Sequence, residues 1–347
     1  LTLAYRQVMA GHKLVEDEQD GLLYISKECL SNGCAATADV SYPSMPMYLL
    51  YNPELVNGML RPILHYAKSA DWPFEFAPHD VGCYPQVNGQ VYCTHSDSSH
   101  QMPIEECGNM LVMAAAAVTA GAGTELFAEN RALFAQWADY LIAHGEDPAD
   151  QICTDDFFRH LAHNCNLGLK AIMGIASMAI LLTRTGDSEA AARYRDTART
   201  MARSWVSRAA KGDGSFRLAF DQPDTFSLKY NIVWDKLFGT GLFTEQELAD
   251  EFASYHQYTN RYGTPLDSRG STSKSDWQAW TGVLAKDSAE FEAFMTPVWR
   301  YFNEMESRVP MADWYSTKTA KYFYMMHRSV QGGLFIRLLA QEDTCRI

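Results

Sequence analysis

Long apolar runs are missing from this 347-residue chain. No stretch reaches the roughly 18 to 20 uninterrupted apolar residues that a membrane-spanning helix needs, so we expect no membrane span. The chain also opens Leu1-Thr2-Leu3, without an initiator methionine or a basic-then-apolar leader. We therefore expect a processed chain or an excised domain.

Basic clusters are missing as well. The sequence holds 29 Lys plus Arg against 42 Asp plus Glu, a net charge of −13, and no dense stretch of Lys or Arg offsets that balance. This excess of negative charge disfavours nucleic acid and anionic membrane surfaces as partners. The expected partner is a small molecule that is neutral or cationic.

Cysteine motifs and metal motifs are equally scarce. The eight cysteines show no CxxC spacing, which argues against a zinc ribbon or a thioredoxin-like motif. Nothing approaches the HExxH pattern, so we expect no metal and no other cofactor. Cys83 and Cys93 flank a loop that contains Asn88-Gly89, and they could pair in an exported chain. Buried free thiols are the alternative, and the one we expect for most of the eight.

Apolar residues make up 47% of the sequence, and they form two kinds of helical segment. Segments 110–120 and 167–182 are apolar on every side, which is typical of buried helices. Segments 124–145 and 187–210 carry an apolar stripe at helical spacing, and the second has arginines mostly on its other sides. The alternation predicts helical hairpins with one helix inside and one outside.

Six such hairpins follow one another along the chain, and no linker-like composition divides them. We predict a single all-α domain over residues 1–347, an (α/α)6 toroid with little β-structure. The best strand candidate is 215–220. The predicted hairpins are 45–70, 103–145, 157–210, 227–261, 275–304, and a C-terminal helix at 328–341 paired with an N-terminal helix at 2–18.

Acidic residues precede or begin the predicted inner helices. Because these helices run parallel, their amino termini meet at one rim, where helix dipoles favour carboxylates. We therefore expect the rim to hold the catalytic acids. The candidates are Asp39, Asp80, Glu105, Glu106, Asp155 and Asp156.

Part of this acidic pattern also has a structural interpretation. Thr154-Asp155-Asp156 before a long helix is typical of an N-cap, but only one of the two aspartates can cap. Pro103 followed by Glu105 and Glu106 likewise indicates a helix start.

Three further groups of polar side chains are candidate substrate-binding residues. His160, His163 and Asn164 lie within about one turn of the predicted inner helix, where they form either a substrate-facing surface or a hydrogen-bond network. The aromatic loop 72–85 carries His79 beside Asp80 and is suited to cover the pocket mouth. Towards the C-terminus, acidic and basic residues occur near tryptophans, a combination suited to binding a zwitterion or a sugar. These residues are Asp267, Arg269, Lys274, Asp276, Trp277 and Trp314.

These motifs, taken in order, resemble the glutaminase A family of fungi and Bacteroides-like bacteria. The resemblance implies the six-hairpin toroid and a secreted or cell-envelope protein, with a β-rich region ahead of this part of the chain. It also implies glutaminase activity, which was assigned to some members. The matching runs are 39–44 (DVSYPS), 50–55 (LYNPEL), 76–82 (FAPHDVG), 102–110 (MPIEECGNM), 155–164 (DDFFRHLAHN), 227–236 (SLKYNIVWDK), 265–269 (PLDSR) and 274–277 (KSDW).

Three functions are compatible with the sequence. The first is a hydrolase that releases ammonia from L-glutamine, which would use a hydroxyl such as Ser44 or Thr154 near His79 or His163. The second is a glycoside hydrolase on the same scaffold, which needs two carboxylates from different rim elements, roughly 5 to 9.5 Å apart. The third is a toroid that binds carbohydrate without catalysis.

Two departures bear on the amidase hypothesis. Cys83 and Cys107 stand where the family would have small hydroxyl residues, so neither position supplies the nucleophile expected from the resemblance. No GxSxG elbow or SxxK motif supplies another.

Overall fold

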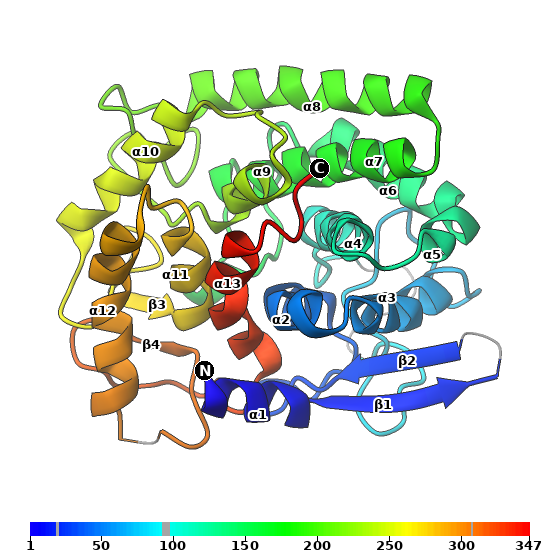
Figure 1. Ribbon diagram of the computed structural model, residues 1–347, viewed down its shortest axis with the longest axis horizontal. Coiled ribbons are helices and arrows are strands. Elements are labelled where there is room, and N and C mark those ends of the chain that lie inside the picture. The colour runs from blue at the N-terminus through cyan, green and yellow to red at the C-terminus, as the bar shows by residue number, and fades with distance from the viewer. Residues whose placement is uncertain (19–20, 92–97, 307) are drawn as a thin grey trace.

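Six helical hairpins close into a ring in the computed structural model, which describes residues 1–18, 21–91, 98–306 and 308–347 (Figure 1). This is the predicted (α/α)6 toroid. The last hairpin closes it, since α1 and α13 both contact the short helix η4 (Ser329–Phe335), which packs on α2. The hairpins in chain order are α2 (Ala38–Tyr51) with α3 (Glu54–Ala67), α4 (Pro103–Thr119) with α5 (Glu125–Glu129) and α6 (Arg131–His144), α7 (Cys165–Arg184) with α8 (Ser188–Ala209), α9 (Val233–Phe238) with α10 (Glu245–Ser254), and α11 (Ser275–Gly282) with α12 (Ser288–Glu304). In the last one, η4 continues into α13 (Ile336–Gln341), and α1 (Thr2–Ala10) packs on η4.

Helices α4 and α7 form the centre of the core. Nearly all of their side chains are buried, as the uniform apolar pattern predicts. Helix α7 is long and apolar enough to cross a membrane, but its apolar stretch is entirely buried inside the fold. It is therefore accounted for as a core helix.

Helix α8 lies at the outer edge of the molecule, with α7 between it and α4 (Figure 1). Its arginines face solvent or acidic neighbours; Arg203, for example, pairs with Glu247 of α10 at 3.0 Å. On the inner side, the buried indole of Trp205 donates to the carbonyl of Cys165 at 2.8 Å. The predicted order of inner and outer helices is confirmed.

Two small antiparallel sheets accompany the helices. Strands β1 (His12–Asp17) and β2 (Gly21–Ser26) pair in register from His12–Ser26 to Asp17–Gly21. Strands β3 (Thr272–Lys274) and β4 (Trp314–Ser316) form the other sheet. The predicted helix over 2–18 is therefore wrong beyond Ala10, because the chain turns at Gly11 to form the hairpin. The best strand candidate, 215–220, forms no named strand and makes isolated bridges from Phe216 to Ala210 and from Ala219 to Asn164.

The chain between α6 and α7 departs from the predicted long helix starting near residue 157. A single 3-10 turn, η1 (Asp156–Phe158), is followed by irregular backbone in which Arg159 and His163 have φ of 82° and 62°. Helix α7 begins only at Cys165, where the side chain of Asn164 accepts hydrogen bonds from Asn166 and Leu167. Asn164, rather than Thr154 or an aspartate, is thus the N-cap.

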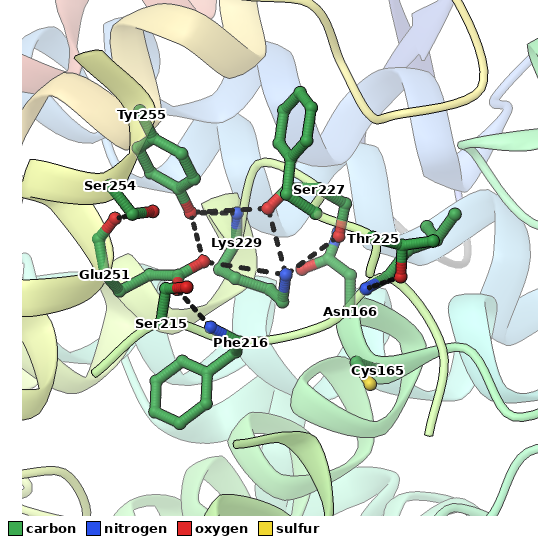
Figure 2. Close-up of polar contacts among 12 residues, drawn as sticks. Cys165, Asn166, Ser215, Phe216, Thr225, Ser227, Lys229, Glu251, Ser254 and Tyr255 are labelled. Atoms are coloured by element: carbon green, nitrogen blue, oxygen red, sulfur yellow. Dashed lines mark hydrogen bonds and ion pairs between the residues drawn. The ribbon is translucent and has the colours of Figure 1, made fainter. Parts of the chain in front are cut away.

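A buried ion pair joins η2 (Tyr230–Ile232) and its preceding loop to α10 (Figure 2). The Lys229 ammonium lies 3.6 Å from Glu251 and donates to the carbonyl and hydroxyl of Ser227, both at 2.9 Å. Tyr255 donates to the same Glu251 carboxylate at 2.7 Å. Because Lys229 already serves these partners, the neighbouring Ser227 lacks a free base, and the cluster is structural.

The close approach of α4 and α7 depends on glycine. A Cβ at Gly108 would lie 2.4 Å from Cγ of Lys170 and 3.0 Å from its carbonyl oxygen. We predict that Gly108→Ala destabilises the protein by about 1 to 3 kcal/mol, because the helices must separate. Gly168→Ala, where the nearest atom is 3.2 Å away, is the matched control and should stay within about 1 kcal/mol of wild type. Urea unfolding of both variants measures the difference; equal stabilities would contradict the packing argument.

Candidate active site

A pocket of about 470 Å³ opens at the amino-terminal end of the inner helices. It is bounded by the first turn of α2, the loop that carries His79, the residue preceding α4, and the segment before α7. A volume of this size suits a small-molecule ligand. Its lining includes Glu28, Cys34, Asp39, His79, Cys83, His100, Met102, Cys153, Thr154, Asp156, Phe157, Met325 and Arg328.

His79 connects two carboxylates at this pocket. Its Nδ1 lies 2.8 Å from Oδ2 of Asp80, and its Nε2 lies 3.4 Å from Oδ1 of Asp39. Burial alone would lower the pKa of His79, but the two carboxylates outweigh it and raise the pKa well above the usual value. An imidazolium therefore links Asp80 to Asp39. Asp80 is itself fixed by the backbone N–H of Gly82 at 2.7 Å.

Asp39 is the ionised carboxylate of the pocket. Burial would raise its pKa, but the hydrogen bond and charge of His79 lower it to about 2. The hydroxyl of Thr154 donates to its other oxygen at 3.3 Å. Asp39 thus stays negatively charged across the ordinary pH range and faces the pocket from the first turn of α2.

Asp156 has the opposite tendency. It lines the same pocket from η1 and is accessible to solvent there. Loss of solvation beside the protein surface, together with the charge of Asp39, raises the pKa of Asp156 to about 6. Asp39 and Asp156 therefore differ within one pocket: the first is ionised and the second is partly protonated near neutral pH.

Glu106 lies behind these groups on α4. It is fully buried; Asn109 donates to one of its oxygens at 2.9 Å, and the other has no hydrogen-bond partner. Burial and the nearby charge of Asp39 raise its pKa well above the usual value, so Glu106 is held protonated.

Among the residues that the structure describes, Asp39, His79 and Glu106 form a group that could hold a metal ion. Their ligand atoms lie within 4.8 Å of one another. The imidazolium of His79 gives Asp39 and Asp80 one positive charge between them, and the protonated Glu106 is neutral.

Glu105 and Asp155 face away from the pocket. Glu105 forms a buried ion pair with Lys170 of α7 at 2.9 Å. Asp155 accepts hydrogen bonds from Tyr230 at 2.9 Å and Asn166 at 3.1 Å, and burial with the charge of Glu105 raises its pKa to about 7. In both adjacent pairs of acids, the structure separates the two members into different surroundings.

Several predicted substrate-binding residues do not line the pocket. His160 and His163 lie on the irregular segment and pair with Asp150 and Asp147, each at 2.8 Å. They were predicted on an inner helix, but the backbone at Arg159 and His163 prevents one there. Asn164 caps α7, and fully buried Ser44 donates to the Ser41 carbonyl, so neither fits its proposed role.

The predicted C-terminal group is likewise structural. Arg269 is held by Asp267 and donates to the Asp155 carbonyl at 3.0 Å, which fixes the segment that carries Asp156. Lys274 lies buried between Asp276 and Asp313, 3.3 Å from each. Trp277 stacks on Tyr230 with ring centroids 3.9 Å apart, and Trp314 stacks on Phe157 at 5.0 Å. These residues support the pocket wall from behind.

Two charged residues of the pocket wall, Arg328 and Glu28, belong to none of the sequence motifs. Arg328 lines the pocket, 3.6 Å from Glu28 and 3.8 Å from Asp313, and is only 3% exposed. A single arginine far from the other motifs carries no pattern that would indicate this position.

The family follows from comparison of the whole chain. Residues 1–338 match the model of the glutaminase A six helical-hairpin domain. The chain belongs to this family. Among its curated relatives, glutaminase A of Aspergillus oryzae is 31% identical over 97% of this chain, and a protein named "Probable glutaminase" of Arthroderma benhamiae is 25% identical over 99%. The chain spans about half the length of these two relatives, 49% of each.

Solved structures of two glycosidases have a fold similar to that of this chain. A bacterial glucoamylase complexed with acarbose superposes with a TM-score of 0.67 at 11% identity, covering 100% of this chain and 56% of the glucoamylase. A GH63 mannosylglycerate hydrolase from Thermus thermophilus in complex with glucose superposes with a TM-score of 0.62 at 8% identity, covering 98% and 99% of the two chains. At these identities the likeness shows the fold alone.

The Lys170–Glu105 ion pair gives a stability prediction. We expect Lys170→Met to destabilise the protein by about 3 to 5 kcal/mol, because it leaves Glu105 buried and unpaired. The double variant Lys170→Met/Glu105→Gln should recover most of this loss, since it removes the unpaired charge. Urea unfolding of the two variants provides the comparison, and a double variant no more stable than Lys170→Met would disprove the electrostatic cause.

Proposed function

We propose that this domain is a hydrolase in which Asp39 acts as base and Asp156 as acid on a water and a small substrate in the 470 Å³ pocket. The supporting observation is the opposite tuning of these two carboxyl groups within one cavity. Their pKa values are about 2 and about 6. Pairs of groups whose surroundings separate their pKa values are typical of acid–base catalysis.

Each step of the proposed reaction uses a side chain that lines the pocket. The Asp39 carboxylate takes a proton from the attacking water, while His79 holds that carboxylate from behind. Protonated Asp156 gives its proton to the leaving nitrogen or oxygen. The guanidinium of Arg328 places positive charge in the pocket wall, where it can orient an anionic group of the substrate.

The first substrate to test is L-glutamine, in keeping with the names of the two relatives. Thr154 lines the pocket with its hydroxyl 3.3 Å from Asp39, and it offers a nucleophilic route to the same product. A burst of ammonia followed by a slow phase would indicate the Thr154 route. Direct attack by water gives no burst.

Glycoside hydrolysis is the second candidate function. Phe157 lines the pocket and is backed by the indole of Trp314, which gives an aromatic surface of the kind that packs against sugar rings. The shared fold of the glucoamylase and the mannosylglycerate hydrolase agrees with it.

A substrate panel distinguishes these functions. Ammonia release from L-glutamine is measured beside leaving-group release from aryl glycosides, with Asp39→Asn as the inactive control. Turnover of one class assigns the reaction. If the protein turns over neither substrate class but still binds saccharides, it is a carbohydrate-binding toroid and the hydrolase proposal is wrong.

Asp156→Asn and Asp155→Asn form a matched pair of adjacent substitutions. We expect Asp156→Asn to lower kcat by about 10²- to 10⁴-fold, because it removes the proton donor. Asp155→Asn should lower kcat less than tenfold, since that carboxyl group contacts Tyr230 and Asn166 rather than the pocket. Initial rates per folded molecule decide between them. The reverse order would move the acid to Asp155.

The pH dependence follows from the same pair. The acid must be protonated and the base ionised, so activity should decline only below a pH of about 2 and again above about 6. Above that upper limit, kcat/KM should fall tenfold for each unit of pH. The fall should disappear in Asp156→Asn. A wild-type profile that rises between pH 6 and 8 would show that Asp156 is not the acid.

A further inference from the structure

Cys34 and Cys83 face each other across two loops at the pocket wall. They form an isolated antiparallel bridge, flanked by hydrogen bonds from Ala35 N to Gly82 O at 2.8 Å and from Tyr84 N to Gly33 O at 3.2 Å. The two cysteines exchange no backbone hydrogen bond with each other. They are therefore a non-hydrogen-bonded antiparallel pair.

This type of pair brings side chains close together. Opposed residues at such a position have Cα atoms about 4.5 Å apart, and disulfides join Cα atoms roughly 4.4 to 6.8 Å apart. Opposed side chains also point to the same face of the ladder. In agreement, both cysteines line the same cavity.

We propose that Cys34 and Cys83 are a site of oxidative modification and form a disulfide in an oxidising environment. Cys83 is the more accessible of the two, whereas Cys34 is buried, and burial raises the pKa of its thiol. The Cys83 thiolate attacks a disulfide oxidant such as oxidised glutathione and releases one thiol. Cys34 then loses its proton, attacks the Cys83 sulfur and releases the second thiol. Two protein thiols are oxidised and one disulfide is reduced.

The cross-link would act on the candidate active site through its backbone. The loop after Cys34 accepts a hydrogen bond from Val81 at Ala35 O, and Ala38 N donates to His79 O at 2.8 Å. A covalent bond between Cys34 and Cys83 therefore fixes the loop that carries His79 against the first turn of α2. It holds the imidazolium of His79 beside Asp39.

Other cysteines have different surroundings in the part of the chain that the structure describes. Cys29 lies on the same loop as Cys34, and its thiol donates to the Lys27 carbonyl at 3.3 Å. The other described cysteines, Cys107, Cys153, Cys165 and Cys345, are buried and form no bridge with this ladder. Cys153 also lines the pocket, where its sulfur accepts a hydrogen bond from Asn164 at 3.8 Å. The sequence also allows Cys83 to pair with Cys93. Because Cys93 lies outside the described residues, the experiment must distinguish a Cys34–Cys83 bond from a Cys83–Cys93 bond.

The test is thiol counting on protein held in graded ratios of reduced and oxidised glutathione. Both native protein and protein refolded from denaturant are used, so that access to buried thiols does not limit the result. Oxidation should remove two alkylatable thiols and two hydrogen atoms of mass. Peptide mapping should recover Cys34 linked to Cys83. The oxidised form should unfold at a temperature roughly 3 to 6 °C higher, because the cross-link closes a long loop.

Single variants assign the bond. Cys34→Ser and Cys83→Ser should each abolish the loss of two thiols, whereas Cys29→Ser and Cys93→Ser should leave it intact. A linkage of Cys83 to Cys93, retained oxidation in Cys34→Ser, or two thiols that stay alkylatable at every ratio would each overturn the proposal.

Discussion

The buried ion pair between Lys170 and Glu105 organises the charges at the rim. The Lys170 ammonium of α7 lies 2.9 Å from Glu105 of α4 and 3.3 Å from the centre of the Tyr42 ring of α2. This one side chain therefore joins three inner helices. Burial raises the pKa values of the neighbouring Glu106 and Asp155, and the charge of Asp39 adds to the first and that of Glu105 to the second. Asp39 is also buried, but His79 keeps it ionised. Burial and the position of the nearest charged partner together decide which carboxyl groups carry protons.

Much of the architecture could be predicted, because a helix that is buried on all sides is apolar on all sides in the sequence. Residues 110–120 and 167–182 are apolar on all sides and are inner helices, and the rim acids follow from the parallel helix starts. Helical periodicity does not reveal the N-terminal β-hairpin, because the chain leaves α1 at Gly11 and residues 12–17 pair with 21–26. Residues 159–163 were wrongly assigned to a helix because the N-cap, Asn164, stands further along the chain.

The site itself was only partly predictable. Asp39, His79 and Asp156 were identified as candidates and line the pocket, but nothing in the sequence distinguishes Asp156 from Asp155. The two are adjacent, yet Asp156 begins the turn η1 and lines the pocket, whereas Asp155 just before it is buried. Lys274, Asp276 and Trp277 were predicted to contact substrate because they are polar and aromatic near the rim. In the structure they are buried: Lys274 pairs with Asp276 and Asp313 and lies over the ring of Trp277. Residue types in the sequence do not show whether a side chain points into the pocket or into the core.

Asp156 stands on an irregular segment rather than on the helix it precedes. Helix α7 has its own cap in Asn164, and Arg269 holds the segment from outside through the Asp155 and Arg159 carbonyls. The segment that carries Asp156 and the start of helix α7 are therefore fixed by different contacts. Substitutions at residues 156–158 can reshape this wall of the pocket, while α7 keeps its cap and the ring of helices stays the same.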